Sequence, residues 1–152
     1  MTTVINGKED LKAKIGEHLG YSEWFEVTQQ RINDFADATG DHQWIHINEE
    51  MAKAGPFGTT IAHGYLTLSL VPMLLSKVMV VEGVKMGVNY GTNKVRLPSP
   101  VPSGSKVRLG ATVVAVEDLP NGSTQNLVDV TIEVEGAPKP SLVAQLVFLY
   151  YF

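Results

Sequence analysis

Cysteine is absent from the 152 residues of this chain. The absence excludes thiol nucleophiles, disulfide bonds and zinc–thiolate sites, and it leaves His, Asp, Glu, Ser, Tyr and Lys as candidate catalytic residues. A chain without cysteine is also compatible with a reducing compartment, so we expect a cytoplasmic protein.

Positive charge is also scarce, since the formal net charge is −4 at pH 7 and no polybasic run occurs. Nucleic acids and anionic lipids attract proteins through basic residues. We therefore expect no nucleic-acid partner. The N-terminal segment carries charges instead of the apolar stretch of a signal peptide. The most apolar run, residues 66–81, is shorter than a membrane span of about 20 residues and contains Pro72 and Lys77, so we expect no membrane association.

Several nucleotide-binding and hydrolase motifs are missing as well. The chain has no GxSxG nucleophile elbow, no GxxxxGK[ST] phosphate loop, no GxGxxG fingerprint and no HExxH zinc motif. The remaining candidates for function are clusters of ordinary polar residues at helix ends.

The residues that are present suit one domain over 1–152, because 44% of them are hydrophobic, enough for a core without metals or disulfides. Helical spacing predicts a short helix over 11–19 that stops at Gly20, and a helix capped by Thr28 that ends at Gly40. An irregular segment follows over 48–60. Residues 61–81 are apolar on nearly all sides and predict one long buried helix with a kink at Pro72. Alternating patterns predict strands over 23–29, 84–90, 107–113 and 128–134 and at the C-terminus.

These elements define an α+β fold class. The antiparallel strands would form a sheet with one apolar face. This face and the long apolar helix bury each other best when the sheet wraps around the helix. That arrangement is the shape of a hot-dog fold, although composition and periodicity are compatible with other α+β arrangements.

The first candidate site is "TGDHQWIHIN", residues 39–48. Gly40 frees the backbone after a helix, so Asp41 and His46 can converge on one reacting group. A histidine accepts a proton from water near neutral pH, and a carboxylate orients that water. The alternative is a solvated turn aspartate and a structural histidine. A metal site at Asp41, His42 and His46 is a further alternative, but it needs both histidines on one helical face, and the β-branched Ile45 and Ile47 disfavour a helix there.

The second candidate site is "AHGYLTLSL", residues 62–70. The first N–H groups of a helix lack partners and carry the positive end of its dipole, and Gly64 lets a ligand oxygen approach. The alternative is a packing glycine preceded by a capping histidine, His63. Two basic pairs, Lys94 with Arg96 and Lys106 with Arg108, each share a strand face. They are solvated edge charges or, in one case, a contact for ligand phosphates.

Both sites together resemble the MaoC-like dehydratases, the (R)-specific enoyl-CoA hydratase branch of the hot-dog proteins. The family signature has the form G-D-x-N-P-[aliphatic]-H followed, after five residues, by a small residue. Five positions match it, with Gln43 and Trp44 in place of Asn-Pro: Gly40, Asp41, Ile45, His46 and Ala52. The stretches "VTQQRINDFADATGDHQWIH", "IAHGYLTLSLVPML" and "VNYGTNKVRLPSPVPSGSKVR" resemble the nodulation protein N-like subgroup, so the resemblance covers most of the chain.

The resemblance implies a reversible syn addition of water to a trans-2-enoyl thioester. Asp41 and His46 would be the catalytic dyad, and the Gly64 backbone N–H would be the oxyanion donor. His63, Trp44 and Arg96 would contact the substrate. No metal and no cofactor would be needed, the substrate would be an acyl-CoA or acyl carrier protein thioester, and the protein would be a homodimer. Two alternatives stay open: a hot-dog acyl-CoA thioesterase and a non-catalytic acyl-CoA binding protein.

Overall fold

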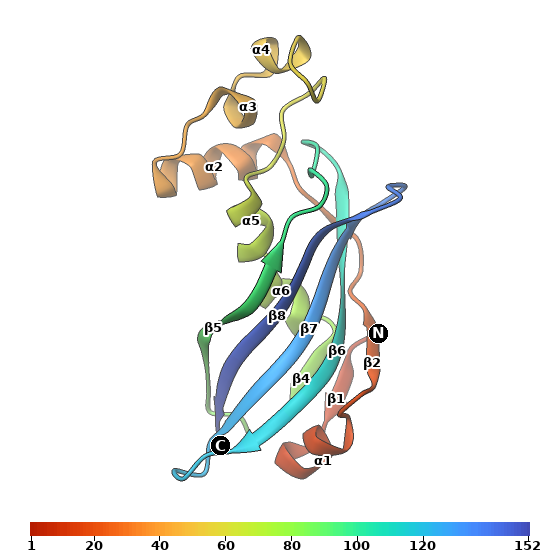
Figure 1. Cartoon of the computed structure of the whole chain (residues 1–152), viewed down its shortest axis with the longest axis vertical. Coiled ribbons are helices and arrows are strands. Elements are labelled where there is room, and N and C mark those ends of the chain that lie inside the picture. Colours follow the sequence, from red (N-terminus) through yellow and green to blue (C-terminus); the bar gives the residue numbers. More distant parts are fainter.

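A six-stranded antiparallel sheet is the framework of the protein in a computed structural model that describes residues 1–152. Its strands run in the order β2-β6-β7-β8-β5, and β3 also pairs with β6. The strands are β2 (His18–Tyr21), β3 (Phe25–Glu26), β5 (Met86–Arg96), β6 (Lys106–Asp118), β7 (Thr124–Val134) and β8 (Pro140–Tyr151). A separate parallel pair joins β1 (Thr3–Ile5) to β4 (Met79–Val81). Figure 1 shows the long strands β6, β7 and β8 curving together through the lower part of the molecule.

The alternation in the sequence explains why the central strands bury one face. In β7 the even-numbered residues Val128, Val130 and Ile132 are buried, whereas Asp129 between them is exposed. Successive side chains of a strand point to opposite faces, so this pattern gives the sheet one dry face. The predicted strands over 107–113 and 128–134 are confirmed, and so is the α+β class.

The buried helix differs from the prediction, because two short helices replace one long one. They are α5 (Gly64–Ser69) and α6 (Val71–Ser76), divided at Leu70. Pro72 lacks the N–H that a continuous helix uses, and the interruption is the single residue Leu70, which keeps right-handed helical dihedrals of φ −75° and ψ −15°. The chain then leaves the helical conformation after Ser76, and the last predicted helical residues form β4. Apolar residues of both helices nevertheless pack into the core against the sheet, as the hot-dog arrangement requires.

The N-terminal helix is also shorter than the prediction. It is α1 (Gly7–Ala13), with Leu11 buried against the core, and the chain turns at Gly16, whose φ of 87° is in the left-handed region. His18 and Leu19 consequently belong to β2, not to the helix. Their helical spacing was coincidental because sheet pairing with β6 decided the conformation.

Three helices lie beyond one end of the sheet, at the top of Figure 1. They are α2 (Gln29–Thr39), α3 (Trp44–Ile47) and α4 (Glu49–Lys53). The Thr28 hydroxyl accepts a hydrogen bond from the Arg31 N–H at 3.2 Å, and Gly40 ends α2 with φ 83°, so both predicted ends of this helix are confirmed. The turn at α3 contradicts the expectation that Ile45 and Ile47 exclude a helix.

The core is one cluster of 25 buried residues drawn from both sheets and from α1, α2, α5 and α6. It lies below the three helices at the end of the sheet, which contribute few of its members. No helix in the structure is long and apolar enough to cross a membrane.

Candidate active site

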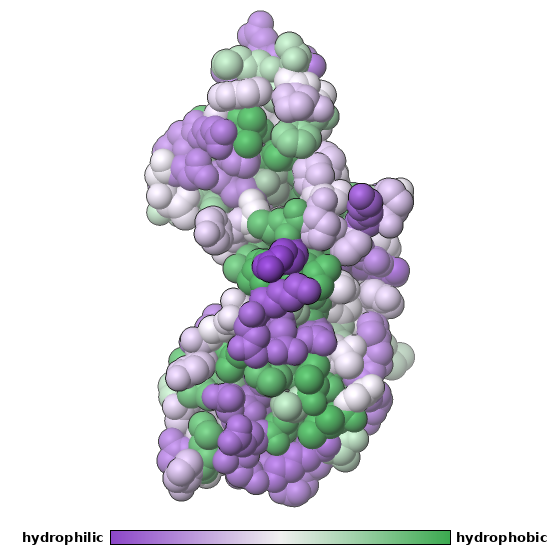
Figure 2. Space-filling model, viewed as in Figure 1, coloured by the Kyte–Doolittle hydropathy of each residue, from purple (hydrophilic) through white to green (hydrophobic).

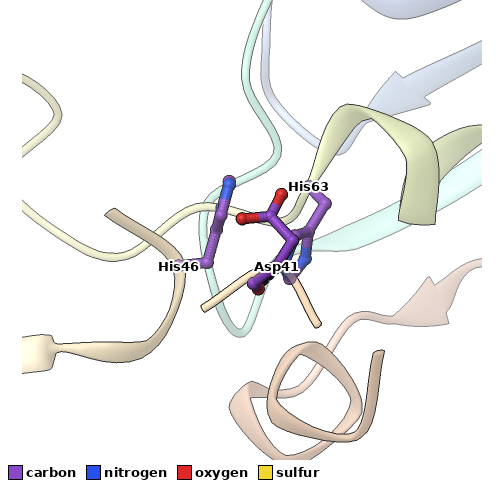
Figure 3. A group of neighbouring side chains, drawn as sticks. All are labelled: Asp41, His46 and His63. Atoms are coloured by element: carbon purple, nitrogen blue, oxygen red, sulfur yellow. Dashed lines mark hydrogen bonds between the residues drawn. The ribbon is translucent and has the colours of Figure 1, made fainter. Parts of the chain in front are cut away.

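Three side chains from separate segments meet at the end of the sheet. Asp41 follows α2, His46 lies in α3, and His63 directly precedes α5. Figure 3 shows them gathered in one place. The polar atoms that they offer lie within 4.8 Å of one another. The structure therefore brings together the two residues of the predicted dyad, and it adds His63 to them.

Asp41 stands on a turn that the sequence dictates. Gly40 takes the left-handed conformation that ends α2, which redirects the chain before Asp41. The Asp41 carboxylate accepts one hydrogen bond, from the Gln43 N–H at 3.3 Å, and the residue is exposed. Aspartate forms such turns with the backbone two residues ahead. The second carboxylate oxygen therefore remains open to solvent or ligand.

His46 is held much more firmly, with 6% of its surface exposed. Its Nδ1 lies 2.7 Å from the Ile61 carbonyl oxygen. Because a carbonyl only accepts, Nδ1 carries the proton and Nε2 is left as an acceptor. The Gln29 side-chain amide donates to the His46 carbonyl at 2.8 Å, and the Thr60 hydroxyl donates to Gln29 in turn. This network fixes both the ring and the backbone of His46.

No direct hydrogen bond joins Asp41 to His46, although their polar atoms are at most 4.8 Å apart. Two hydrogen bonds of about 2.8 Å that meet at one water molecule span roughly 4.6 Å. The gap between the carboxylate and the imidazole is therefore short enough for a single water molecule to bridge them. A carboxylate in such a place can orient a water molecule, and an imidazole nitrogen without a protein partner can accept a proton from it.

The start of α5 supplies unpaired donors. His63 is its N-cap residue, but the His63 side chain makes no capping hydrogen bond. The N–H groups of the first turn are therefore left without side-chain partners, as an anion-binding helix end requires. Gly64 lies tightly under Leu97, whose Cδ1 occupies the space that a side-chain carbon at position 64 would need. A side chain at Gly64 would therefore displace Leu97 from the helix end.

Trp44 and Arg96 lie at the same end of the molecule. Trp44 begins α3 with 36% of its surface exposed, and its ring leaves only 3.0 Å to the place of a Cβ on Gly55. Gly55 therefore makes room for the tryptophan that replaces the family proline. Arg96 ends β5, directly before Leu97, and its guanidinium donates to the Val95 carbonyl. The contacts that the sequence predicts between the substrate and Trp44, Arg96 and His63 stay predictions.

Arg108 of the basic pair on β6 is engaged elsewhere. Arg108 forms an ion pair with Glu133 and lies over the rings of Tyr21 and Trp24, at 4.1 Å and 4.7 Å from their centroids. It is therefore part of the sheet surface and is not free for a phosphate.

The residues that could form a metal site differ between the structure and the sequence-based alternative. The His42 ring turns away to Asp37 at 3.0 Å, and that carboxylate raises the pKa of His42 above its usual value. His63 takes its place beside Asp41 and His46. The His46 and His63 rings stack at 3.9 Å with 24° between their planes. The structure therefore does not bring together the trio that the sequence suggested for a metal, Asp41, His42 and His46.

Sequence reasoning missed several supporting residues. Gln29 and Thr60 hold His46, and the Ile61 carbonyl sets its tautomer. A main-chain acceptor leaves no mark in a sequence, because any residue type provides a carbonyl. One feature of the sequence could have indicated a supporting role for Gln29, namely its position as a polar residue in the first turn of α2.

Comparison with known proteins identifies the class first. Solved structures with the same hot-dog architecture include a monoamine oxidase regulatory protein from Archaeoglobus fulgius, with a TM-score of 0.77 and 27% identity over 99% of this chain and 97% of that one. The (R)-hydratase from A. caviae involved in PHA biosynthesis superimposes with a TM-score of 0.71 at 19% identity, over 88% of this chain and 94% of that one.

The family follows from the sequence comparisons. The model of the MaoC like domain matches residues 10–135. The 3-hydroxyacyl-thioester dehydratase Z of Mycobacterium tuberculosis is 56% identical over 93% of both chains. Nodulation protein N of Rhizobium leguminosarum bv. viciae is 43% identical over 94% of this chain and 90% of its own. The chain belongs to the MaoC-like dehydratase family, and the predicted resemblance to the nodulation protein N-like subgroup is confirmed.

Proposed function

We propose that this protein is a (3R)-hydroxyacyl-thioester dehydratase, which in the reverse direction is an (R)-specific enoyl-CoA hydratase. The observation that carries the proposal is the placement of Asp41 and His46 with polar atoms within 4.8 Å of each other, beside the start of α5. The 56% identity to a 3-hydroxyacyl-thioester dehydratase supports the same hydro-lyase class.

In the hydration direction, Asp41 and His46 hold one water between them. His46 Nε2 and the Asp41 carboxylate withdraw a proton as the water oxygen bonds to the β-carbon. The proton is then delivered to the α-carbon on the same face, which gives syn addition and regenerates both groups. Dehydration follows the same steps in reverse. No redox step occurs, so the proposal requires no cofactor.

The thioester oxygen gains negative charge as the β-carbon is attacked. In this proposal it points at the Gly64 N–H, which no side chain caps. A fixed donor at a helix N-terminus stabilises charge that develops only in the transition state. The two sites of the sequence thus perform complementary parts of one reaction.

An apolar groove supports a thioester with an acyl chain. It has a volume of about 780 Å³ and lies between the α5–α6 segment, β4, β5 and β8. Leu68 lines it and stands one helical turn after Gly64 on the same face of α5. The acyl chain would pass along this face, and the pantetheine arm of CoA or acyl carrier protein would leave near Arg96. Residues 1–152 act as one catalytic domain, in the cytoplasm.

The edge strand β5 supports a homodimer. It ends the sheet, and nearly all of its residues are exposed, including Met86, Val88 and Tyr90 at 51%, 38% and 70%. Figure 2 shows hydrophobic surface between hydrophilic groups on the face that carries β5 and β8. Unpaired apolar edges are normally covered, and a second copy covers them through a two-fold axis. Light scattering should therefore give twice the mass of one chain, and Val88→Lys should reduce it.

The proposal is tested with crotonyl-CoA and a longer 2-enoyl-CoA. Asp41→Asn and His46→Ala should remain folded yet lose hydration by at least about 10³-fold, since each removes one partner of the proton transfer. Loss of enoyl absorbance reports hydration. Release of free CoA would instead indicate the thioesterase, and binding of a saturated acyl-CoA without turnover would indicate the binding protein.

Matched controls lie in the same segment. Asp37→Asn and His42→Ala remove the same residue types from a pair that is exposed and bonded to each other. Both should hydrate the substrate at near-normal rates. Normal rates in Asp41→Asn or His46→Ala would contradict the proposed dyad.

A further inference from the structure

His63 contacts all three parts of the proposed active site. Its ring stacks on His46 with centroids 3.9 Å apart, and its Nε2 lies 3.0 Å from the main-chain oxygen of Asp41. Its own backbone leads directly into Gly64 at the start of α5. Only 2% of its surface is exposed, and the Phe35 ring of α2 lies 5.0 Å away.

The hydrogen bonds define the tautomer of His63. The Asp41 carbonyl only accepts, so Nε2 of His63 carries the proton and Nδ1 has a lone pair. His46 has the opposite tautomer, because its Nδ1 donates to the Ile61 carbonyl. The Nδ1 of His63 is the one buried side-chain nitrogen or oxygen in the chain that has no hydrogen-bond partner. Such unpaired buried groups are rare and costly, so a packing role alone would favour an apolar residue.

Asp41 is the group that needs support. Its carboxylate has a single hydrogen bond, 3.3 Å long, and the residue is exposed on a turn. The His63 N–H on its main-chain oxygen ties this turn to a ring that itself rests on His46. The position of the carboxylate relative to the imidazole therefore depends on His63.

We propose that His63 is a positioning residue that holds the Asp41 turn beside the His46 ring, acting through its Nε2–H bond and its stacked ring. The inference rests on the proposed function. His63 acts here without contacting the reacting atoms, since its Nε2 is bonded to the Asp41 main-chain oxygen and its ring lies against His46.

Two substitutions separate the two contacts. His63→Phe keeps a ring against His46 and Phe35 but has no donor for the Asp41 carbonyl. His63→Gln places an amide N–H near the position of Nε2 without the ring. We expect His63→Phe to lower kcat by about 10- to 100-fold, the range typical of residues that orient a catalytic group, with KM within about twofold. His63→Gln should recover most of the lost kcat.

A double-mutant cycle tells positioning from a general effect on the fold. If His63 acts through Asp41, then His63→Phe should cost less than about twofold in an Asp41→Asn background, since residues that act as a unit are not additive. The same loss of kcat in both backgrounds, or wild-type kcat in His63→Phe, would overturn the proposal.

A measurement on the unmodified protein covers the case in which a variant does not fold. Long-range proton–nitrogen NMR of the four histidine rings should show His63 protonated at Nε2 and His46 protonated at Nδ1 at neutral pH. A His63 that is protonated at Nδ1 alone has no donor for the Asp41 carbonyl and overturns the proposal whatever the enzyme activity. Conversely, if Asp41→Asn and His46→Ala hydrate normally while the tautomers are as stated, the proposed function fails and the hydrogen bonds stand.

Discussion

The two ends of this molecule are stabilised in different ways. At the sheet end, most buried residues are aliphatic, and Leu74, Leu109 and Ile132 are fully enclosed, although five small polar residues are buried there too: Ser22, Ser123, Thr124, Asn126 and Ser141. At the site end, the buried set includes His46, Thr60 and His63, which are fixed by single hydrogen bonds to main-chain or amide oxygens. Apolar burial provides most of the free energy of folding, whereas single hydrogen bonds add little but fix direction. Stability and the geometry of the candidate site are therefore supplied by separate regions, the sheet end and the site end.

This separation has a chemical reason. A water-activating site needs an acceptor and a carboxylate that are not saturated by the protein, and such groups stabilise the fold poorly. The sheet and the α5–α6 segment supply the stability that the site end lacks. Substitutions at the two ends should therefore affect different measurements.

The largest stability effect is expected from Leu74→Ala. Leu74 lies in α6 with no exposed surface, so the change should cost about 2–5 kcal/mol of the free energy of unfolding. Urea denaturation measures the loss, and activity per folded molecule should stay within about twofold. Ile15→Ala, at a residue that is 47% exposed, is the control and should cost about 0.5 kcal/mol or less. A severe loss of kcat in folded Leu74→Ala would contradict the view that the sheet end supplies stability without setting the geometry of the site.

Gln29→Ala should lower the rate of catalysis more than the stability, and by a smaller free energy than Leu74→Ala lowers the stability. The Gln29 amide bonds the His46 carbonyl and accepts from Thr60, so its removal should loosen His46. We expect kcat to fall about tenfold, equivalent to roughly 1.4 kcal/mol in the transition state, with KM little changed. Gln30→Ala is the matched control, since Gln30 bonds only Asp34 on the exposed side of the same helix. Equal kcat values in the two variants would show that Gln29 does not support His46 in catalysis.

Thr28→Ala tests the scaffold that carries the site. The Thr28 hydroxyl caps α2, and its loss should cost about 1 kcal/mol of the free energy of unfolding. Thr28→Ser keeps the hydroxyl and should restore the stability. Thermal unfolding followed by circular dichroism compares the three proteins, and an unchanged midpoint in Thr28→Ala would show that the cap is dispensable.

The smallest effect concerns the sheet end at high pH. Burial beside Phe148 and Phe152 raises the pKa of the Tyr150 phenol above its usual value of 10.0. As the pH rises, the phenol ionises in the unfolded chain at a lower pH than in the folded protein. Tyr150 therefore has no effect on the free energy of unfolding below about pH 10, and it lowers that free energy as the pH rises toward the raised pKa. Tyr150→Phe should have near-normal stability at neutral pH and less alkaline sensitivity. Spectrophotometric titration of tyrosinate should show that the last tyrosine to ionise is missing in this variant.

Local sequence determined the elements whose signals are short-range. Thr28 and Gly40 set the ends of α2 because a cap and a left-handed glycine act within one turn. The alternation in β6 and β7 set their buried faces, since side chains of a strand alternate regardless of the partner. The spacing of "GDHQWIH" and "AHG" identified Asp41, His46 and Gly64, and their resemblance to the family gave the reaction.

Tertiary structure decided what depends on residues far apart in the chain. Pairing with β6 turned His18 and Leu19 from helix to strand, and pairing with β1 ended the apolar helix before Met79. The helical turn at Ile45 forms although β-branched residues disfavour it, and the Ile61 N–H bonds its carbonyl. The link from His63 to the Asp41 carbonyl spans 22 residues and uses a backbone oxygen. Every residue has such an oxygen, so the sequence could predict the candidate pair Asp41 and His46, and only the fold decided what holds these two residues in place.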